Sequence, residues 1–189
     1  MKTIRTFIAI HIPELVKESI SELQKSLKDV DARISWTRID NMHITLKFLG
    51  DVDITRIERI GTVLEGALRD FKKFKVAIEG VGVFPDTRRP RVLWVSGVSE
   101  NHLLEDMAAK IELALKELGF EAEKRKFTIH LTIGRVKEYT NIDKITSKLM
   151  ENKEFRGGSF DVTEVILMQS ELNPSGSIYT PLKIINLQS

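Results

Sequence analysis

An internal repeat with an offset of 87–88 residues runs through this chain of 189 residues. Each copy has the same order of hydrophobic patterns, strand–helix–strand–strand–helix–strand, and its helical stretches carry apolar residues every three to four positions. Three pairs of equivalent positions share the offset: Ile4 and Val92 (88 residues), His43 and His130 (87), and Ile54 and Ile142 (88). A duplicated β-α-β-β-α-β unit predicts the α+β class, with two pseudo-symmetric lobes whose antiparallel sheets line a central cleft.

We interpret residues 1–189 as one bilobal domain. The first copy covers about residues 4–84 and the second about 91–170, and a closing strand over 178–186 looks like the start of a third copy at a sheet edge. The expected strands cover residues 4–12, 34–36, 42–49, 74–84, 91–98, 127–135 and 160–170, and the expected helices have their apolar faces within 16–27, 57–68, 104–118 and 142–150.

The composition excludes several classes of protein. The chain has no cysteine, which excludes a disulfide scaffold, thiolate zinc sites, iron–sulfur clusters and a cysteine nucleophile. The net charge of +2 is too small for a protein that coats nucleic acid, and no apolar run is as long as a membrane span. The apolar part of the N-terminal MKTIRTFIAIHI is too short for a signal peptide, so we expect a cytoplasmic protein. Three basic clusters are expected to be solvated loops: Lys72, Lys73 and Lys75; Arg88, Arg89 and Arg91; and Lys124, Arg125 and Lys126.

Both copies carry the same tripeptide pattern on the same expected strand, His-Ile-Thr at 43–45 and His-Leu-Thr at 130–132. Side chains alternate between the two faces of a strand, so His43, Thr45 and Lys47 are expected on one face. The same alternation puts His130 and Thr132 together on one face of the second copy. The apolar residues between them face the core, which leaves these polar side chains on the open side. If a two-fold axis relates the lobes, two imidazoles and two hydroxyls meet across the cleft.

This set of side chains suits displacement at phosphorus. Imidazole titrates near neutral pH, so a neutral ring can accept a proton from the attacking oxygen while a charged ring protonates the leaving oxygen. The hydroxyls of Thr45 and Thr132 can donate to the non-bridging phosphate oxygens, and Arg135 offers a guanidinium fork that fits a phosphate. Strict alternation points Arg135 away from the site, so its role requires that Gly134 breaks the strand.

The paired motif resembles the duplicated His-x-Thr signature of the two-histidine phosphoesterase superfamily, and most closely its RNA 2′,3′-cyclic phosphodiesterase branch, also called 2′-5′ RNA ligase. The resemblance covers nearly the whole chain, through RTFIAIHIP, HITLKFLGDV, PRVLWVSGV, HLTIGRV and SIYTPLKII. It implies hydrolysis of RNA 2′,3′-cyclic phosphate ends to 2′-phosphates without metal or cofactor, and possible reversible 2′-5′ ligation. It also implies that His43 donates a proton, that His130 accepts one, and that Thr45, Thr132 and Arg135 bind phosphate. Phe48 stands where the second copy has Arg135, so the two half-sites differ chemically.

Two other functions are conceivable for such a chain. A metal hydrolase is disfavoured, because neither histidine has a close second histidine, and Asp40, three residues before His43, is an isolated candidate ligand. A glycine-rich phosphate loop is absent. A non-catalytic module that binds a nucleotide or an RNA end is the alternative from another class. The expected partner is RNA with a 2′,3′-cyclic phosphate end, with tRNA halves as one candidate. We expect no membrane association, and we expect a monomer.

Overall fold

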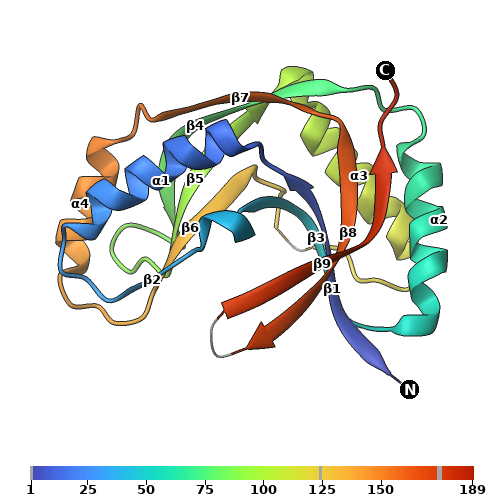
Figure 1. The fold of residues 1–189 in the computed structure, drawn as a ribbon, viewed down its shortest axis with the longest axis horizontal. Coiled ribbons are helices and arrows are strands. Elements are labelled where there is room, and N and C mark those ends of the chain that lie inside the picture. Colours follow the sequence, from blue (N-terminus) through green and yellow to red (C-terminus); the bar gives the residue numbers. More distant parts are fainter. Residues whose placement is uncertain (1, 124, 174–175) are drawn as a thin grey trace.

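The structure, a computed structural model, describes residues 2–123, 125–173 and 176–189 and contains both helices and strands (Figure 1). Its strands are β1 (Thr3–His11), β2 (Ile34–Trp36), β3 (His43–Asp53), β4 (Phe74–Phe84), β5 (Val92–Ser99), β6 (His130–Val136), β7 (Arg156–Val162), β8 (Glu164–Asn173) and β9 (Gly176–Asn186). Its α-helices are α1 (Glu14–Lys28), α2 (Ile57–Leu68), α3 (Leu103–Lys116) and α4 (Ile142–Glu151), and its 3₁₀ helices are η1 (Ile39–Asn41), η2 (Ile54–Arg56) and η3 (Glu100–His102). The α+β class is confirmed.

The strands form two sheets, and every pairing within them is antiparallel, as expected. The four-stranded sheet has the order β3-β1-β8-β9, and the five-stranded sheet has the order β2-β6-β5-β4-β7. The lobes do not coincide with the two halves of the sequence, because β2 and β4 of the first half belong to the five-stranded sheet. Strands β8 and β9 complete the four-stranded sheet in their place, with β9 at its edge. The duplication itself stays a prediction.

Helices α1 and α3 likewise do not pack mainly on the sheet whose strand precedes them in the chain. Helix α1 follows β1 of the four-stranded sheet but packs on β7 and α4, whereas α3 follows β5 of the five-stranded sheet but packs on α2 and β3. In Figure 1, α1 and α4 therefore lie together at one end of the molecule, and α2 and α3 lie together at the other. No helix in the described part of the chain is long and apolar enough to cross a membrane.

The expected single strand over residues 160–170 is wrong, because the structure has two strands there. Strand β7 pairs with β4 in the five-stranded sheet, and β8 pairs with β1 in the four-stranded sheet, so the chain changes sheets at Thr163. The run Val165–Met168 in β8 is buried on both faces: Val165 and Leu167 belong to the main core, and Ile166 and Met168 pack with Phe7 and Ala9 on the other side. A doubly buried strand carries a continuous apolar run, and such a run hides the boundary with its neighbour.

One residue is inserted at the same place in both histidine strands. In β3, Leu46 lies between Thr45, which pairs with Ala9, and Lys47, which pairs with Ile8. In β6, Ile133 lies between Thr132 and Gly134, which pair with the consecutive residues Trp94 and Leu93. These β-bulges are 87 residues apart, the offset of the two histidines. A bulge reverses the alternation of the side chains that follow it.

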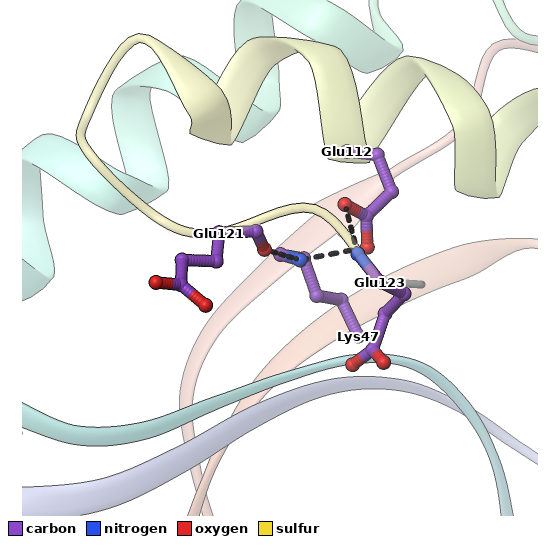
Figure 2. A network of polar contacts seen from close by, with 4 residues as sticks. All are labelled: Lys47, Glu112, Glu121 and Glu123. Carbon is purple, nitrogen blue, oxygen red and sulfur yellow. Dashed lines mark hydrogen bonds and ion pairs between the residues drawn. The ribbon is translucent and has the colours of Figure 1, made fainter. Parts of the chain in front are cut away.

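The first bulge corrects the expectation for Lys47. Its side chain does not share a face with His43 and Thr45, but lies buried on the opposite face, with only 3% of the residue exposed. The Lys47 amine donates to Glu112 Oε1 at 2.7 Å and to the Glu121 carbonyl at 2.8 Å, while Glu112 Oε2 accepts from the Glu123 backbone amide at 3.3 Å (Figure 2). This network joins β3 to α3 and to the loop that leads towards β6.

Candidate active site

A cavity of about 700 Å³ lies between the two sheets. The four-stranded sheet contributes residues of β1, β3, β8 and β9 to its wall, and the five-stranded sheet contributes residues of β2 and β6. All five side chains that the sequence singled out line this cavity: His43, Thr45, His130, Thr132 and Arg135. The structure therefore brings the two motifs to one place, although they are far apart in the chain.

His43 is held by aromatic side chains of its own sheet. Its ring centroid is 4.8 Å from that of Phe7 in β1 and 5.2 Å from that of Tyr179 in β9. Phe7 and Tyr179 also contact each other, with centroids 5.0 Å apart. These contacts fix the orientation of the imidazole and shield one side of it from water.

His130 has a matching support in the five-stranded sheet. Its ring lies 5.2 Å from Phe84 and 6.4 Å from Trp94, measured between centroids. Trp94 fits beside the strand because position 82 is glycine, where an added Cβ would lie 2.2 Å from the Trp94 ring. A larger residue at position 82 would displace the indole and, through it, His130.

Each histidine has the same hydrogen bond at Nδ1. His43 Nδ1 lies 2.8 Å from the Asn41 carbonyl, and His130 Nδ1 lies 2.7 Å from the Thr128 carbonyl, in both cases two residues earlier in the chain. A carbonyl oxygen can only accept a hydrogen bond, so Nδ1 carries the proton in both rings. Nε2 is therefore the nitrogen that each ring has available to a ligand, as an acceptor when the ring is neutral and as a donor when it is charged.

The electrostatics of His43 favour the neutral ring. Burial lowers the pKa of His43 to about 4, against the opposing effect of the hydrogen bond to Asn41, and the nearby His11 and His130 lower it further. His11 stands directly opposite His43 in the pairing of β1 with β3. In the unliganded protein at neutral pH, His43 is therefore an uncharged imidazole.

The second bulge brings Arg135 to the cavity. The condition derived from the sequence was that Gly134 breaks the strand, but β6 continues through Gly134 to Val136, and the inserted residue is Ile133. The shift returns Arg135 to the face of Thr132. The equivalent shift in β3 places Phe48 on the cavity wall, with 56% of the residue exposed. The hydroxyls of Thr45 and Thr132 form no hydrogen bond within the described residues, so both can bind a ligand.

The wall of the cavity carries positive charge only. Arg5, Arg38 and Arg135 line it, and no aspartate or glutamate does so in the described part of the chain. Sequence reasoning missed Arg5 and Arg38, because each is a single cation outside the basic clusters. Those clusters do not line the cavity as far as the structure describes them, and Lys124 lies outside the described residues. The one available signal for Arg5 was its alternation with Phe7 and His11 along β1.

No group of three or more histidine and acidic side chains arranged to hold a metal ion is found in residues 2–123, 125–173 and 176–189. The chemistry that this site offers without a metal is proton transfer by two imidazoles. It also offers hydrogen bonds and positive charge for an anion.

The chain matches known proteins over nearly its full length. The sequence profile of the LigT-like phosphoesterases matches residues 10–94 and 97–179. A protein of Methanothermobacter thermautotrophicus named RNA 2′,3′-cyclic phosphodiesterase is 37% identical over 184 residues, which are 97% of this chain and 99% of that protein. A Thermotoga maritima protein of the same name is 38% identical over 94% of this chain and 92% of its own length.

Solved structures have the same fold. Escherichia coli LigT, crystallised with 3′-AMP, superposes with a TM-score of 0.79 at 26% sequence identity. The superposition covers 100% of both chains. A protein of Thermus thermophilus gives a TM-score of 0.82 over 98% of both chains, and at 23% identity it supports the fold alone.

Proposed function

This chain belongs to the LigT-like phosphoesterases, and on that basis we propose that it hydrolyses the 2′,3′-cyclic phosphate at an RNA end to a 2′-phosphate. The observation that carries the proposal is the pair of histidines on one cavity, each with Nδ1 bound to a carbonyl and Nε2 available. Binding alone does not need two such rings, whereas opening a cyclic phosphate needs a base for the attacking oxygen and an acid for the leaving oxygen. The proposed chemistry requires no metal ion.

In this mechanism His130 accepts a proton from water, which attacks phosphorus, and His43 protonates O3′ as the P–O3′ bond breaks. The product carries its phosphate on O2′. Thr45 and Thr132 donate hydrogen bonds to the non-bridging oxygens, and the Arg135 guanidinium balances the charge that builds up on them.

The low pKa of His43 adds a requirement to its role as acid. The ring is neutral in the free protein, so it must gain a proton before it can donate one. A phosphate anion held against the ring stabilises the imidazolium and raises the pKa of His43. Substrate binding therefore protonates the His43 imidazole, so the protein takes up a proton together with the RNA end.

An assay with an oligonucleotide that ends in a 2′,3′-cyclic phosphate tests the proposal. The protein should convert the cyclic end with many turnovers per molecule, and added EDTA should leave the rate unchanged. Binding that saturates at one equivalent without turnover would refute the enzyme and favour the module that binds an RNA end. A rate that disappears with EDTA and returns with a divalent ion would refute the mechanism.

The proposal extends to ligation and to the cellular setting. If the 5′-hydroxyl of a second RNA, in place of water, attacks the cyclic phosphate, the ring opens and a 2′-5′ linkage forms, with the same two histidines as base and acid. Paired tRNA halves are the candidate substrates for this ligation. The protein is further proposed to act as a monomer in the cytoplasm. Sedimentation during turnover checks the monomer, and incubation of paired tRNA halves checks ligation.

A further inference from the structure

The cavity contains more positive charge than a cyclic phosphate requires. Arg135 belongs to the His130 motif and serves the phosphate at the reaction centre. Arg5 and Arg38 also line the cavity, and neither guanidinium group forms an ion pair or hydrogen bond within the described residues. Asp51 stands opposite Arg5 in β3 but makes no ion pair with it. A cyclic phosphate is a monoanion, so two guanidinium groups are left without an anion.

Arg5 lies two residues before Phe7 in β1, on the side away from His11, which pairs with His43. The Phe7 ring contacts His43 at 4.8 Å between centroids, and both Arg5 and Phe7 line the cavity from the same face of β1. Two residues of a strand span about 6.6 Å, a step comparable to that between successive phosphates of an RNA strand. The Phe7 ring therefore separates the Arg5 guanidinium from a phosphate bound at His43.

Arg38 lines the cavity from the segment between β2 and η1. It follows β2, and its Cδ lies beside Gly176, 3.7 Å from where a Cβ on that glycine would stand. The Asn41 amide donates to the Ser177 carbonyl at 2.7 Å, which fastens this start of β9 to η1. Arg38 is thus held near the beginning of the strand that carries Tyr179.

The direction of the strands places the two arginines on a common side. Strands β1 and β9 are both antiparallel to β8, so they run in the same direction. Arg5 precedes Phe7 in β1, and Gly176 precedes Tyr179 in β9, while Phe7 and Tyr179 are the rings that contact His43. Through Thr6, Gln169 and Thr180, Arg5 stands level with Tyr179, and Gly176 lies three residues before Tyr179. Both arginines therefore lie on the side of Phe7 that faces away from His11, the residue paired with His43.

We propose that Arg5 and Arg38 form a second phosphate subsite, which binds the phosphodiester on the 5′ side of the nucleotide that carries the cyclic phosphate. This inference rests on the proposed function and specifies its substrate as an RNA end of at least two nucleotides. The terminal nucleotide of such an RNA has its only other phosphate at its 5′ oxygen, one nucleotide away from the reaction centre. Two guanidinium groups, one from β1 and one from the segment after β2, can hold that phosphate between them.

Two dinucleotides test the subsite by equilibrium binding. Both end in a 2′-phosphate, and they differ only in the internal linkage, which is a phosphodiester in one and a neutral methylphosphonate in the other. Calorimetry at low salt should give the wild-type protein an affinity about tenfold higher for the charged linkage. Arg5→Gln and Arg38→Gln should each reduce this ratio to about threefold, and the double variant should bring it to about one. Arg69→Gln, at an exposed arginine that does not line the cavity, is the matched control and should keep the wild-type ratio.

A wild-type ratio near one would overturn the subsite. Variants that weaken both dinucleotides equally would also overturn it, because they would place the guanidinium groups at the terminal phosphate. Turnover of a dinucleotide with a cyclic phosphate end is measured in parallel. A lack of turnover would count against the proposed function, while the binding ratio would still decide the subsite.

Discussion

Replacing Glu112 by glutamine should destabilise the protein more than replacing Lys47 by methionine, although the two side chains form one ion pair. The Lys47 side chain is 2% exposed and that of Glu112 is 22% exposed. Glu112→Gln leaves a buried ammonium group without a counter-charge, and removing one partner of a buried pair costs about 3–5 kcal/mol. We expect about 3 kcal/mol, the lower end of that range, because water reaches the partly exposed position of Glu112.

Lys47→Met removes the buried charge and keeps a chain of similar length. The remaining Glu112 carboxylate is partly exposed and keeps its hydrogen bond from the Glu123 amide, so the cost should be about 1 kcal/mol. Combining the two changes should cost less than the sum of the single costs, because the double variant leaves no unpaired ammonium group.

Urea unfolding at neutral pH measures these free energies. The matched control is Asp161→Asn, which removes the partner of Lys75 in a pair whose side chains are 55% and 65% exposed, and it should cost less than about 1 kcal/mol. If Glu112→Gln costs no more than this control, or if Lys47→Met proves the more damaging change of the pair, the unpaired Lys47 ammonium group is not what destabilises the protein.

Three further predictions concern side chains of the cavity. The pKa of His43 should be near 4 in the free protein and should rise when inorganic phosphate binds; NMR titration of the ring protons measures both values, and a free-state pKa near the ordinary 6.5 would contradict the account. The pKa of His43 in the folded protein lies below its value in the unfolded chain, so the neutral ring contributes to the free energy of unfolding above about pH 6.5. This contribution, about 3 kcal/mol, is lost as the pH falls towards 4, and His43→Gln should reduce the loss. Thr45→Val and Thr132→Val should each lower phosphate affinity and turnover about tenfold by removing a donor, whereas Thr62→Val on α2 should change neither; equal effects at all three positions would remove the threonines from the site.

Periodicity in the sequence was enough to predict the fold class and the helices and strands, except for the boundary between β7 and β8. The apolar spacing of Val16, Ile20, Leu23 and Leu27 gives α1 its buried face, and the alternation of β6 leaves His130 and Thr132 on the open side. The repeat offset then related the two motifs. These features are local or depend on a single distance along the chain.

The bulges and the exchange of strands are not visible in the sequence. Leu46 and Ile133 are apolar residues within apolar rows, so nothing in their chemistry marks an insertion, although each reverses the alternation that follows. The positions of Lys47, Phe48 and Arg135 all depend on this shift. The pairing of β4 with β5 and of β8 with β1 is set by packing between distant segments, which periodicity does not encode.

The position of the phosphate in the product tests the two-histidine mechanism most directly. Phosphorus NMR of a dinucleotide opened from its 2′,3′-cyclic form should show a 2′-phosphate alone, because His43 protonates O3′ while His130 activates water. The same assay should lose about 10²–10⁴ in rate with His43→Ala or with His130→Ala, and the double variant should lose far less than the product of the two. A 3′-phosphate product would mean that the acid protonates O2′, and it would contradict the account even if both histidines proved essential.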